Sequence, residues 1–155
     1  MNAFLKEYEG RYEYRALTPA DKGTIWQFLN RWENGKSDDV GQHLEGEIVG
    51  IHELLNNLDK INAKIAGVFI DGQLEAFTVG SYNPTDRMAV IHIEKANADI
   101  RGLYTFINQQ FLVHEFADAV LVNREDDVGM EALRKAKQSY HPIMMVRKFS
   151  MQQKR

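Results

Sequence analysis

The most restrictive feature of the sequence is a run of three consecutive strand patterns between Lys64 and Ala96. The patterns cover Lys64–Ile70, Gln73–Tyr82 and Arg87–Ala96, and each is rich in apolar, β-branched or aromatic residues. Asp71 and Gly72 separate the first two, and this dipeptide favours the two-residue turn of a tight hairpin. The residues "NPTD" at 83–86 predict a second turn. The centre of the fold is therefore predicted to be an antiparallel three-stranded sheet.

The segments on either side of this sheet predict helices and further strands. Thr18 and Pro19 favour the start of a helix, as N-cap and first helical residue. The order is β-α-α-β-β-β-α-β-α-β, which predicts the α/β (α+β) class: a mixed, mostly antiparallel sheet with helices on both faces. The flanking elements are a strand at 11–17, a helix after Pro19, a loop at 33–42, a helix at 43–61, a helix at 100–117, a short apolar strand at 119–123 buried on both faces, a helix at 128–139 and a last strand at 143–149.

Length and composition narrow the protein class. The 155 residues predict one domain over 1–155. The absence of cysteine excludes disulfides and cysteine-ligated zinc, and the histidines show no metal-binding spacing, so no metal site is expected. No apolar run approaches the roughly 18 residues of a membrane span, and the first ten residues lack a signal-peptide core. We therefore expect a cytoplasmic chain without a membrane span.

Charge is distributed unevenly along the chain. The net charge is −3, yet residues 131–155 hold 7 Lys and Arg residues and one acidic residue. Such a basic end can favour a phosphate-bearing partner such as RNA. The alternative is a basic C-terminus that is simply solvated.

A polar segment follows the apolar strand predicted at 119–123. Asn123, Arg124 and Glu125 come at its carboxyl end, which is where open α/β sheets bind ligands, so they are candidate binding residues. Lys137 and Tyr140 end the next helix and are further candidates, although they can instead pack over the sheet edge. The acids at 126 and 127 and the bases at 134–137 also suit the two ends of a helix dipole, without any function.

His92 and Glu94 form the second candidate pair. They alternate on the strand Arg87–Ala96, which predicts that they share one face while Ile91 and Ile93 share the other. A histidine and a carboxylate on one face can transfer protons. The alternative is a polar cross-strand pair without catalytic role. Because this strand and 119–123 should be parallel neighbours, we expect His92, Glu94, Asn123, Arg124 and Glu125 to converge on one cleft.

Four segments together resemble one known family. They read "HIEKAN", "GLYTFINQQF", "VNREDDVGMEALRKAKQSYHP" and "VRKF", and the strongest match spans about Ile91 to Phe149. They are similar to the C-terminal domain of phosphatidylglycerol lysyltransferases, which have tandem halves of the GNAT acetyltransferase fold; this chain corresponds to the second half. The resemblance implies transfer of an aminoacyl group, possibly from aminoacyl-tRNA, to an amine or hydroxyl acceptor. In GNAT-like enzymes a carboxylate on the corresponding strand often acts as general base, which implies this role for Glu94. From the residues themselves, either Glu94 or His92 is expected to take the proton.

The segment "NADIRGLY" lies where GNAT enzymes hold the coenzyme A pyrophosphate. Gly102 fits the usual pattern, but Asp99 and Tyr104 replace the residues that favour an anion, so no cofactor is expected and acetyl-CoA is disfavoured. Tyr104 and Asn108 can line a different pocket, and Asn108 is a candidate binding residue; Tyr104 also fits the core.

Three functions stay open from the sequence. The first is a GNAT-like acyl or aminoacyl transferase, with aminoacyl-tRNA held by the basic C-terminal segment. The second is a CoA-dependent N-acetyltransferase. The third is a non-catalytic half-domain that binds a ligand or pairs with another chain, either as a homodimer or with a second GNAT-like half.

Overall fold

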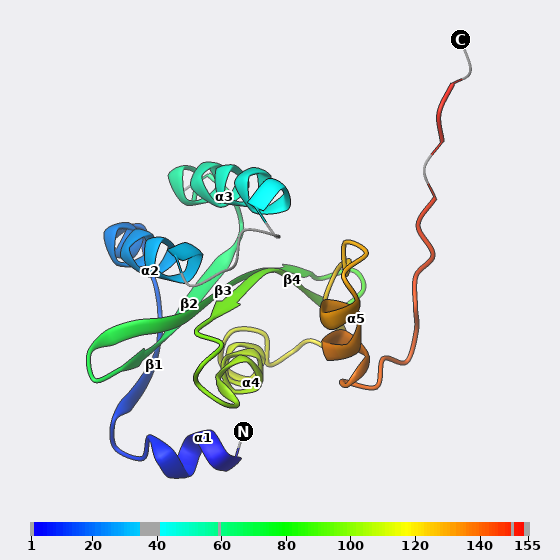
Figure 1. Ribbon diagram of the computed structural model, residues 1–155. Coiled ribbons are helices and arrows are strands. Elements are labelled where there is room, and N and C mark those ends of the chain that lie inside the picture. Colours follow the sequence, from blue (N-terminus) through cyan, green and yellow to red (C-terminus); the bar gives the residue numbers. More distant parts are fainter. Residues whose placement is uncertain (1, 35–40, 59, 150, 154–155) are drawn as a thin grey trace. The chain divides into compact units, whose positions relative to one another are not determined.

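A computed structural model describes residues 2–34, 41–58, 60–149 and 151–153, and the chain divides into two compact units (Figure 1). Among the described residues, the first unit, Met1–Asn123, contains the sheet and four α-helices, and the second, Arg124–Arg155, contains one helix and the C-terminal segment. The prediction of a single domain over 1–155 stays a prediction.

The first unit is built on a five-stranded sheet in the order β1-β2-β3-β4-β5. The strands are β1 (Tyr12–Ala16), β2 (Lys64–Ile70), β3 (Gln73–Asn83), β4 (Met88–Ala96) and β5 (Leu121–Asn123). β1 to β4 pair antiparallel in sequence order, and β5 pairs parallel with β4. This confirms the predicted mixed, mostly antiparallel sheet. The hairpin at Asp71 and Gly72 is confirmed as well, since both residues have the positive φ that its turn requires.

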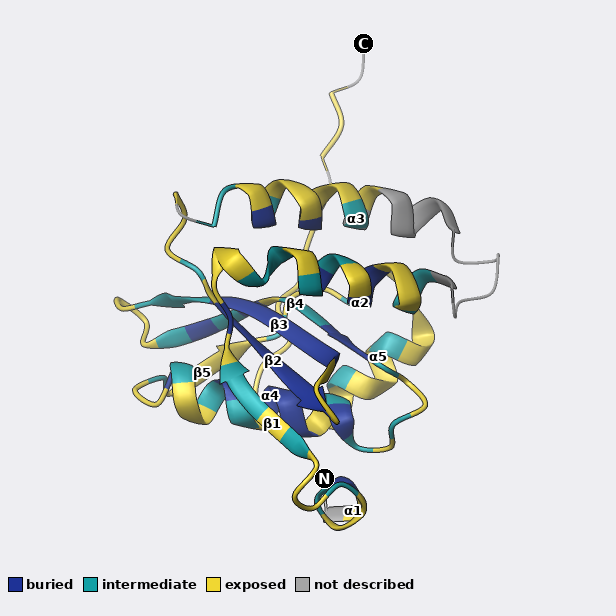
Figure 2. Cartoon of the chain, turned by 90° about the vertical axis from the view of Figure 1, so that its left-hand side faces the viewer, coloured by how far each residue is buried: buried dark blue, intermediate teal, exposed yellow. Residues whose placement is uncertain are grey.

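Helices cover both faces of this sheet (Figure 2). On one face, α2 (Lys22–Asn34) and α3 (Gly41–Asn56) contribute Ile25, Leu29, Ile51 and Leu55 to a core with Phe77 and Val79 of β3. On the other, α4 (Leu103–Glu115) packs Phe106, Ile107 and Phe111 against the sheet. The inner strands β2 and β3 are consequently buried on both sides.

The N-terminal helix α1 (Asn2–Glu7) has no counterpart in the sequence prediction. Phe4 is fully buried beside Tyr8, Tyr12 and Phe106, so the helix is held by aromatic packing and not by its own short hydrogen-bonded turns. The predicted helix start at Thr18 and Pro19 is confirmed in the 3-10 helix η1 (Pro19–Asp21), where the Thr18 N–H donates to the Asp21 carboxylate. Residues 35–40 of the predicted loop 33–42 and the side chain of His43 lie outside the described residues.

Two predictions about the last strands were wrong. The strand at 119–123 was expected to be buried on both faces, but β5 has three exposed residues and is an edge strand of the described sheet. Residues 143–149 were expected to be a strand, but they have no regular secondary structure. The two errors have one cause: a strand needs partners for its backbone groups, and an apolar pattern in the sequence does not show which partners it finds.

The second unit contains α5 (Glu131–Gln138), which begins three residues later than predicted. Asp126 and Asp127 were expected to lie at the start of this helix, where its dipole favours acids. They instead accept the backbone N–H groups of Val128 and Gly129, at 3.0 and 2.9 Å, and so fix the turn that precedes it. Within the helix, Glu131 lies in the first turn and Lys135 and Lys137 in the last, as the dipole favours.

The described helices include none that could cross a membrane, by length and apolar character together.

Candidate functional site

The candidate site in the first unit lies along the part of β4 that extends beyond β5. β5 pairs with β4 only from Met88 to Val90, where Val90 faces Asn123. The residues of β4 from Ile91 to Ala96 pair with β3 alone among the described strands. One edge of this stretch therefore has backbone groups that β5 does not use, and Glu94 and His92 both belong to it.

Glu94 is anchored to helix α4. The Asn108 side-chain amide donates a hydrogen bond of 2.8 Å to the Glu94 carboxylate. Asn108 is 4% exposed, whereas Glu94 is half-buried. The structure places Asn108 in the interior, where it orients the half-buried Glu94 carboxylate; that Asn108 binds substrate stays a prediction. The two predicted site residues are thus brought together, with Asn108 behind Glu94.

His92 points to the other face of the sheet. The strand pairing shifts between Val79 and Gly80, which face Ile93 and Ile91, so His92 is an extra residue in a β-bulge. A Cβ on Gly80 would meet Phe111 of α4, so the next residue, Ser81, faces away from α4. His92 Nε2 lies 2.8 Å from Ser81 Oγ.

The prediction that His92 and Glu94 share a face was therefore wrong, and so was the pairing of Ile91 with Ile93. Ile91 packs with Phe111, while Ile93 packs with the α2 and α3 core. One extra residue reverses the alternation along a strand, and this is the physical reason for the error. As a consequence, His92 and Glu94 do not form a proton-transfer pair on one face of the sheet. Of the two side chains, Glu94 is the one that lies on the α4 side.

Sequence reasoning missed a second polar cluster, on the α2 face of β4. The Lys95 amine lies 4.4 Å from the centre of the Trp32 ring, and Lys95 is 9% exposed. The Trp32 indole N–H donates to the Ala96 carbonyl at 3.2 Å. The sequence did not indicate that Lys95 is buried, because its burial depends on the packing of α2 against β4, which places Lys95 beside the Trp32 ring.

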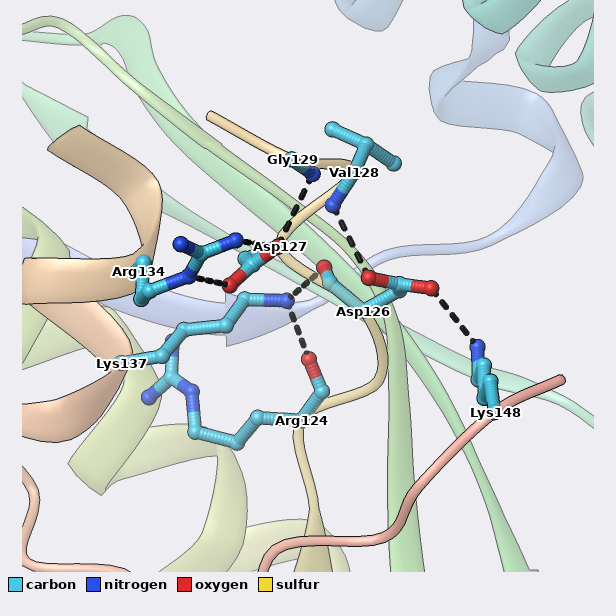
Figure 3. Close-up of polar contacts among 8 residues, drawn as sticks. All are labelled: Arg124, Asp126, Asp127, Val128, Gly129, Arg134, Lys137 and Lys148. Carbon is cyan, nitrogen blue, oxygen red and sulfur yellow. Dashed lines mark hydrogen bonds and ion pairs between the residues drawn. The ribbon is translucent and has the colours of Figure 1, made fainter. Parts of the chain in front are cut away.

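Arg124 and Lys137, two of the predicted binding residues of the second unit, lie together (Figure 3). The Lys137 amine donates to the backbone carbonyls of Arg124 and Asp126, both at 2.5 Å. The Arg124 guanidinium lies 4.2 Å from the centre of the Tyr140 ring. Burial, followed by the nearby Arg124 charge, lowers the pKa of Lys137. Lys137 thereby joins the loop at Arg124 to the helix that ends near Tyr140.

Ion pairs surround this cluster. Arg134 binds Asp127 at 2.6 Å, Lys135 binds Glu131 at 2.7 Å, and Lys148 binds Asp126 at 3.1 Å. The Arg134 contact, followed by the Gly129 N–H, lowers the pKa of Asp127. The Lys148 contact and the Val128 N–H do the same for Asp126. The basic residues of α5 are thus engaged with acids and carbonyls of their own unit.

The start of α4 corresponds to the segment compared with a pyrophosphate loop. Gly102 precedes the helix with φ of 85°, and Tyr104 packs against the core with Leu103 and Phe106. Tyr104 therefore packs with the core, which is one of the two roles considered for it. Asp99 is exposed, and its N–H is bonded to the Asn97 side chain.

The structure does not test the remaining predictions about the site. The convergence of Glu94 with Arg124 and Glu125 stays a prediction, since they belong to separate units. Two surface hollows of the first unit lie elsewhere: one is lined by Leu5, Lys6 and Tyr12, the other by Leu17, Leu58 and Glu115. Over the described part of the chain, no three histidine, aspartate or glutamate residues gather as a metal site would require.

Comparison with protein families gives a match over residues 1–152 to the family described as phosphatidylglycerol lysyltransferase, C-terminal. The chain belongs to this family. The resemblance inferred from the four sequence segments is thereby confirmed, and the match extends well beyond them.

Relatives of the family member described here include proteins of about twice its length. An uncharacterised protein of Mycoplasmoides gallisepticum is 24% identical over 96% of this chain and 47% of its own length. A conserved protein of unknown function from Bacteroides thetaiotaomicron has a structure with a TM-score of 0.85, 30% identity, and coverage of 93% of this chain and 48% of that one. The chain spans about half the length of both.

Acetyltransferase structures share the fold at low identity. The ribosomal-protein-alanine N-acetyltransferase of Brucella melitensis biovar Abortus 2308 aligns with a TM-score of 0.58 at 16% identity, over 94% of this chain and 99% of that chain. The predicted GNAT-like fold is confirmed by this likeness, which concerns the fold alone.

Proposed function

We propose that this protein is a GNAT-like acyltransferase that moves an aminoacyl group, with aminoacyl-tRNA as donor, onto an amine or hydroxyl acceptor. The observation that carries the proposal is the Glu94 carboxylate, held by buried Asn108 on the part of β4 that β5 leaves uncovered. Membership of the phosphatidylglycerol lysyltransferase C-terminal family supports the aminoacyl group as the one transferred.

The proposed chemistry needs one base next to an accessible carbonyl. The acceptor nitrogen or oxygen attacks the ester carbonyl carbon of the aminoacyl donor while Glu94 removes its proton. The new bond forms a tetrahedral intermediate, and the bond from that carbon to the donor ribose oxygen then breaks. Glu94 returns the proton to the departing oxygen, so the carboxylate is restored after each turnover.

Asn108 has a positioning role in this scheme. Its amide donates to one carboxylate oxygen, which fixes the orientation of the Glu94 side chain beside α4.

The donor is supported by the basic C-terminal residues. Residues 131–155 carry 7 Lys and Arg residues against one acid. Because Arg134 and Lys135 are ion-paired, their contribution to RNA binding would require exchange of carboxylate for phosphate partners, a process that salt weakens strongly. The positive charge of residues 131–155 would contribute little to the binding of a donor that has no phosphates.

CoA-dependent N-acetylation is the second candidate function, and the fold likeness to an alanine N-acetyltransferase favours it. The start of α4 argues against it. Asp99 is an exposed acid near the helix N-terminus and would repel a pyrophosphate, while Tyr104 fills its position with a packed ring.

A thermal-shift comparison separates these candidates. The protein is heated with aminoacyl-tRNA, with the same tRNA after deacylation, and with acetyl-CoA, all at one salt concentration, because a ligand that binds only the folded state raises the melting temperature. We expect a larger shift with aminoacyl-tRNA than with deacylated tRNA, and none with acetyl-CoA. A shift with acetyl-CoA alone would replace the proposal by the acetyltransferase, and no shift with any tRNA would remove the tRNA donor.

A further inference from the structure

A serine and a histidine of adjacent strands are hydrogen-bonded on the face of the sheet that lies opposite α4. Ser81 Oγ of β3 is 2.8 Å from His92 Nε2 of β4. This distance falls within the range of about 2.6–3.2 Å over which a histidine can take the proton of a nucleophilic hydroxyl. The aminoacyl transfer proposed above uses Glu94, on the α4 side, and leaves the Ser81 and His92 pair without a role.

The bulge in β4 is what brings the two side chains together. Ile93 faces Val79 across the sheet, and His92 is the extra residue of β4 at this point. Without the bulge, His92 would face Val79, which is fully buried in the core under α2 and α3. The bulge instead gives that core an isoleucine and leaves the imidazole beside Ser81. Bulges that re-aim a side chain in this way are common next to active sites.

The pair is accessible to a substrate. The core under α2 and α3 includes Phe77 and Val79, and Ser81 lies two residues further along the same face of β3. Ser81 is half-buried and His92 is exposed. Val90, which pairs with Ser81 across the two strands, is half-buried and adds an apolar surface next to the hydroxyl. An acyl group can therefore lie on Val90 with its carbonyl carbon close to Ser81.

We propose that Ser81 and His92 form a second catalytic centre, which hydrolyses carboxylic esters through an acyl group bound to Ser81. A hydroxyl is a weak nucleophile by itself and becomes a good one when an adjacent base takes its proton. Ser–His pairs of this geometry occur on unrelated folds, so the geometry and not the fold defines them. The activity is independent of the aminoacyl transfer proposed for Glu94.

The reaction has two steps. Ser81 Oγ attacks the ester carbonyl carbon while His92 Nε2 takes the hydroxyl proton; the bond from that carbon to the alcohol oxygen then breaks, and His92 gives the proton to the departing alcohol. Water next attacks the acyl group on Ser81 and gives a proton to His92. The bond to Oγ breaks, Oγ regains a proton from His92, and a carboxylic acid leaves. The sum is ester and water to acid and alcohol, with the protein unchanged.

The first test uses p-nitrophenyl acetate and the full chain. Release of nitrophenolate gives the rate, and mass spectrometry of peptides from the quenched protein locates the acetyl group. We expect acetyl on Ser81 in the natural chain and none at this position in Ser81→Ala. His92→Gln should slow the acetylation of Ser81 at least about a hundredfold, the lower end of what a general base contributes.

Two matched variants serve as controls. Ser139→Ala removes an exposed serine of the second unit, and His114→Gln removes an exposed histidine of α4 whose Nε2 is 3.2 Å from the Gln110 side chain. Both should keep the natural rate at Ser81. Circular dichroism checks that each variant is folded, and the position of the acetyl group in the natural chain is informative even if a variant unfolds.

The second test uses a fluorophosphonate, which transfers its phosphonyl group to a base-activated serine and releases fluoride. The natural chain should be labelled on Ser81, His92→Gln should be labelled at least about a hundredfold more slowly, and the chain unfolded in urea should not be labelled there, because the activation needs the folded pair. Acetyl and phosphonyl groups found only on lysines or other serines would overturn the proposal. Labelling of Ser81 at the natural rate in His92→Gln would overturn it as well.

Discussion

Replacing Asn108 by alanine tests whether the hydrogen bond to Glu94 organises the site. The Asn108 amide is buried and lies 2.8 Å from the half-buried Glu94 carboxylate. A hydrogen bond to a charged group contributes about 1.5–3 kcal/mol, and its removal leaves the carboxylate with less solvation. We therefore expect Asn108→Ala to destabilise the first unit by about 1.5–3 kcal/mol.

Trp26 and Trp32, the two tryptophans of the chain, provide the assay. Both belong to α2, so their fluorescence during urea unfolding reports on the first unit. At this chain length 1 kcal/mol corresponds to about 2–4 °C, so the melting temperature of Asn108→Ala should fall by about 3–12 °C.

The neighbouring Gln109 supplies the control. It is exposed on the same helix, and Gln109→Ala should change stability by less than about 0.5 kcal/mol. If Asn108→Ala loses no more stability than Gln109→Ala, the Asn108 contact does not hold Glu94 and the positioning role fails. Glu94→Gln keeps an oxygen that can accept the Asn108 N–H, so its loss should stay within about 1 kcal/mol.

Three further predictions concern other parts of the chain. Gly80→Ala places a Cβ 2.8 Å from the Val90 carbonyl and 2.9 Å from Phe111, so it should lower the free energy of unfolding in urea by about 1–3 kcal/mol. Gly46→Ala, in open space on α3, should raise it by up to about 1 kcal/mol. Equal effects of the two variants would contradict the close packing at the β4 bulge. Because Arg134 lowers the pKa of Asp127, the stability from this contact is complete above the unfolded pKa of about 3.9 and is lost as pH falls through the lower folded pKa. The Gly129 amide resonance should therefore move only below about pH 4, and movement near neutral pH would contradict the contact. The triple change of Arg134, Lys135 and Lys137 to Gln should reduce the salt dependence of tRNA binding by about 2 to 3 units of logarithmic slope, with Lys6→Gln as control; an unchanged slope would place the RNA elsewhere.

The parts of the fold that depend on neighbouring residues were predictable from the sequence. Asp71 and Gly72 favour one turn wherever they occur between strands, and Thr18 and Pro19 mark a helix start by local hydrogen bonding alone. The acids and bases of 126–137 were likewise explained by local electrostatics, although Asp126 and Asp127 stabilise the turn before α5 and not its first residue.

The parts that depend on distant residues were not predictable. The bulge at His92 accompanies the close approach of Gly80 to Phe111, which lies in another element, and alternation along β4 gives no sign of it. The position of β5 at the edge of the described sheet and the irregular conformation of 143–149 depend on which partners a strand finds, and an apolar strand pattern does not show them. For this reason Glu94 and Asn108 could be selected as candidates, but their contact could not.

The central claim is that Glu94 acts as the base in aminoacyl transfer, and the most direct measurement is the transfer rate of Glu94→Gln. The rate is measured with aminoacyl-tRNA and a set of amine and hydroxyl acceptors, beside the natural chain and His92→Gln, with urea unfolding of each variant. We predict that Glu94→Gln loses at least a hundredfold in rate, the lower end of what general base catalysis contributes, while it keeps its stability within about 1 kcal/mol. His92→Gln, on the other face of the sheet, should lose far less. Full activity of Glu94→Gln, or a loss that only accompanies unfolding, would contradict the assignment of Glu94 as the base.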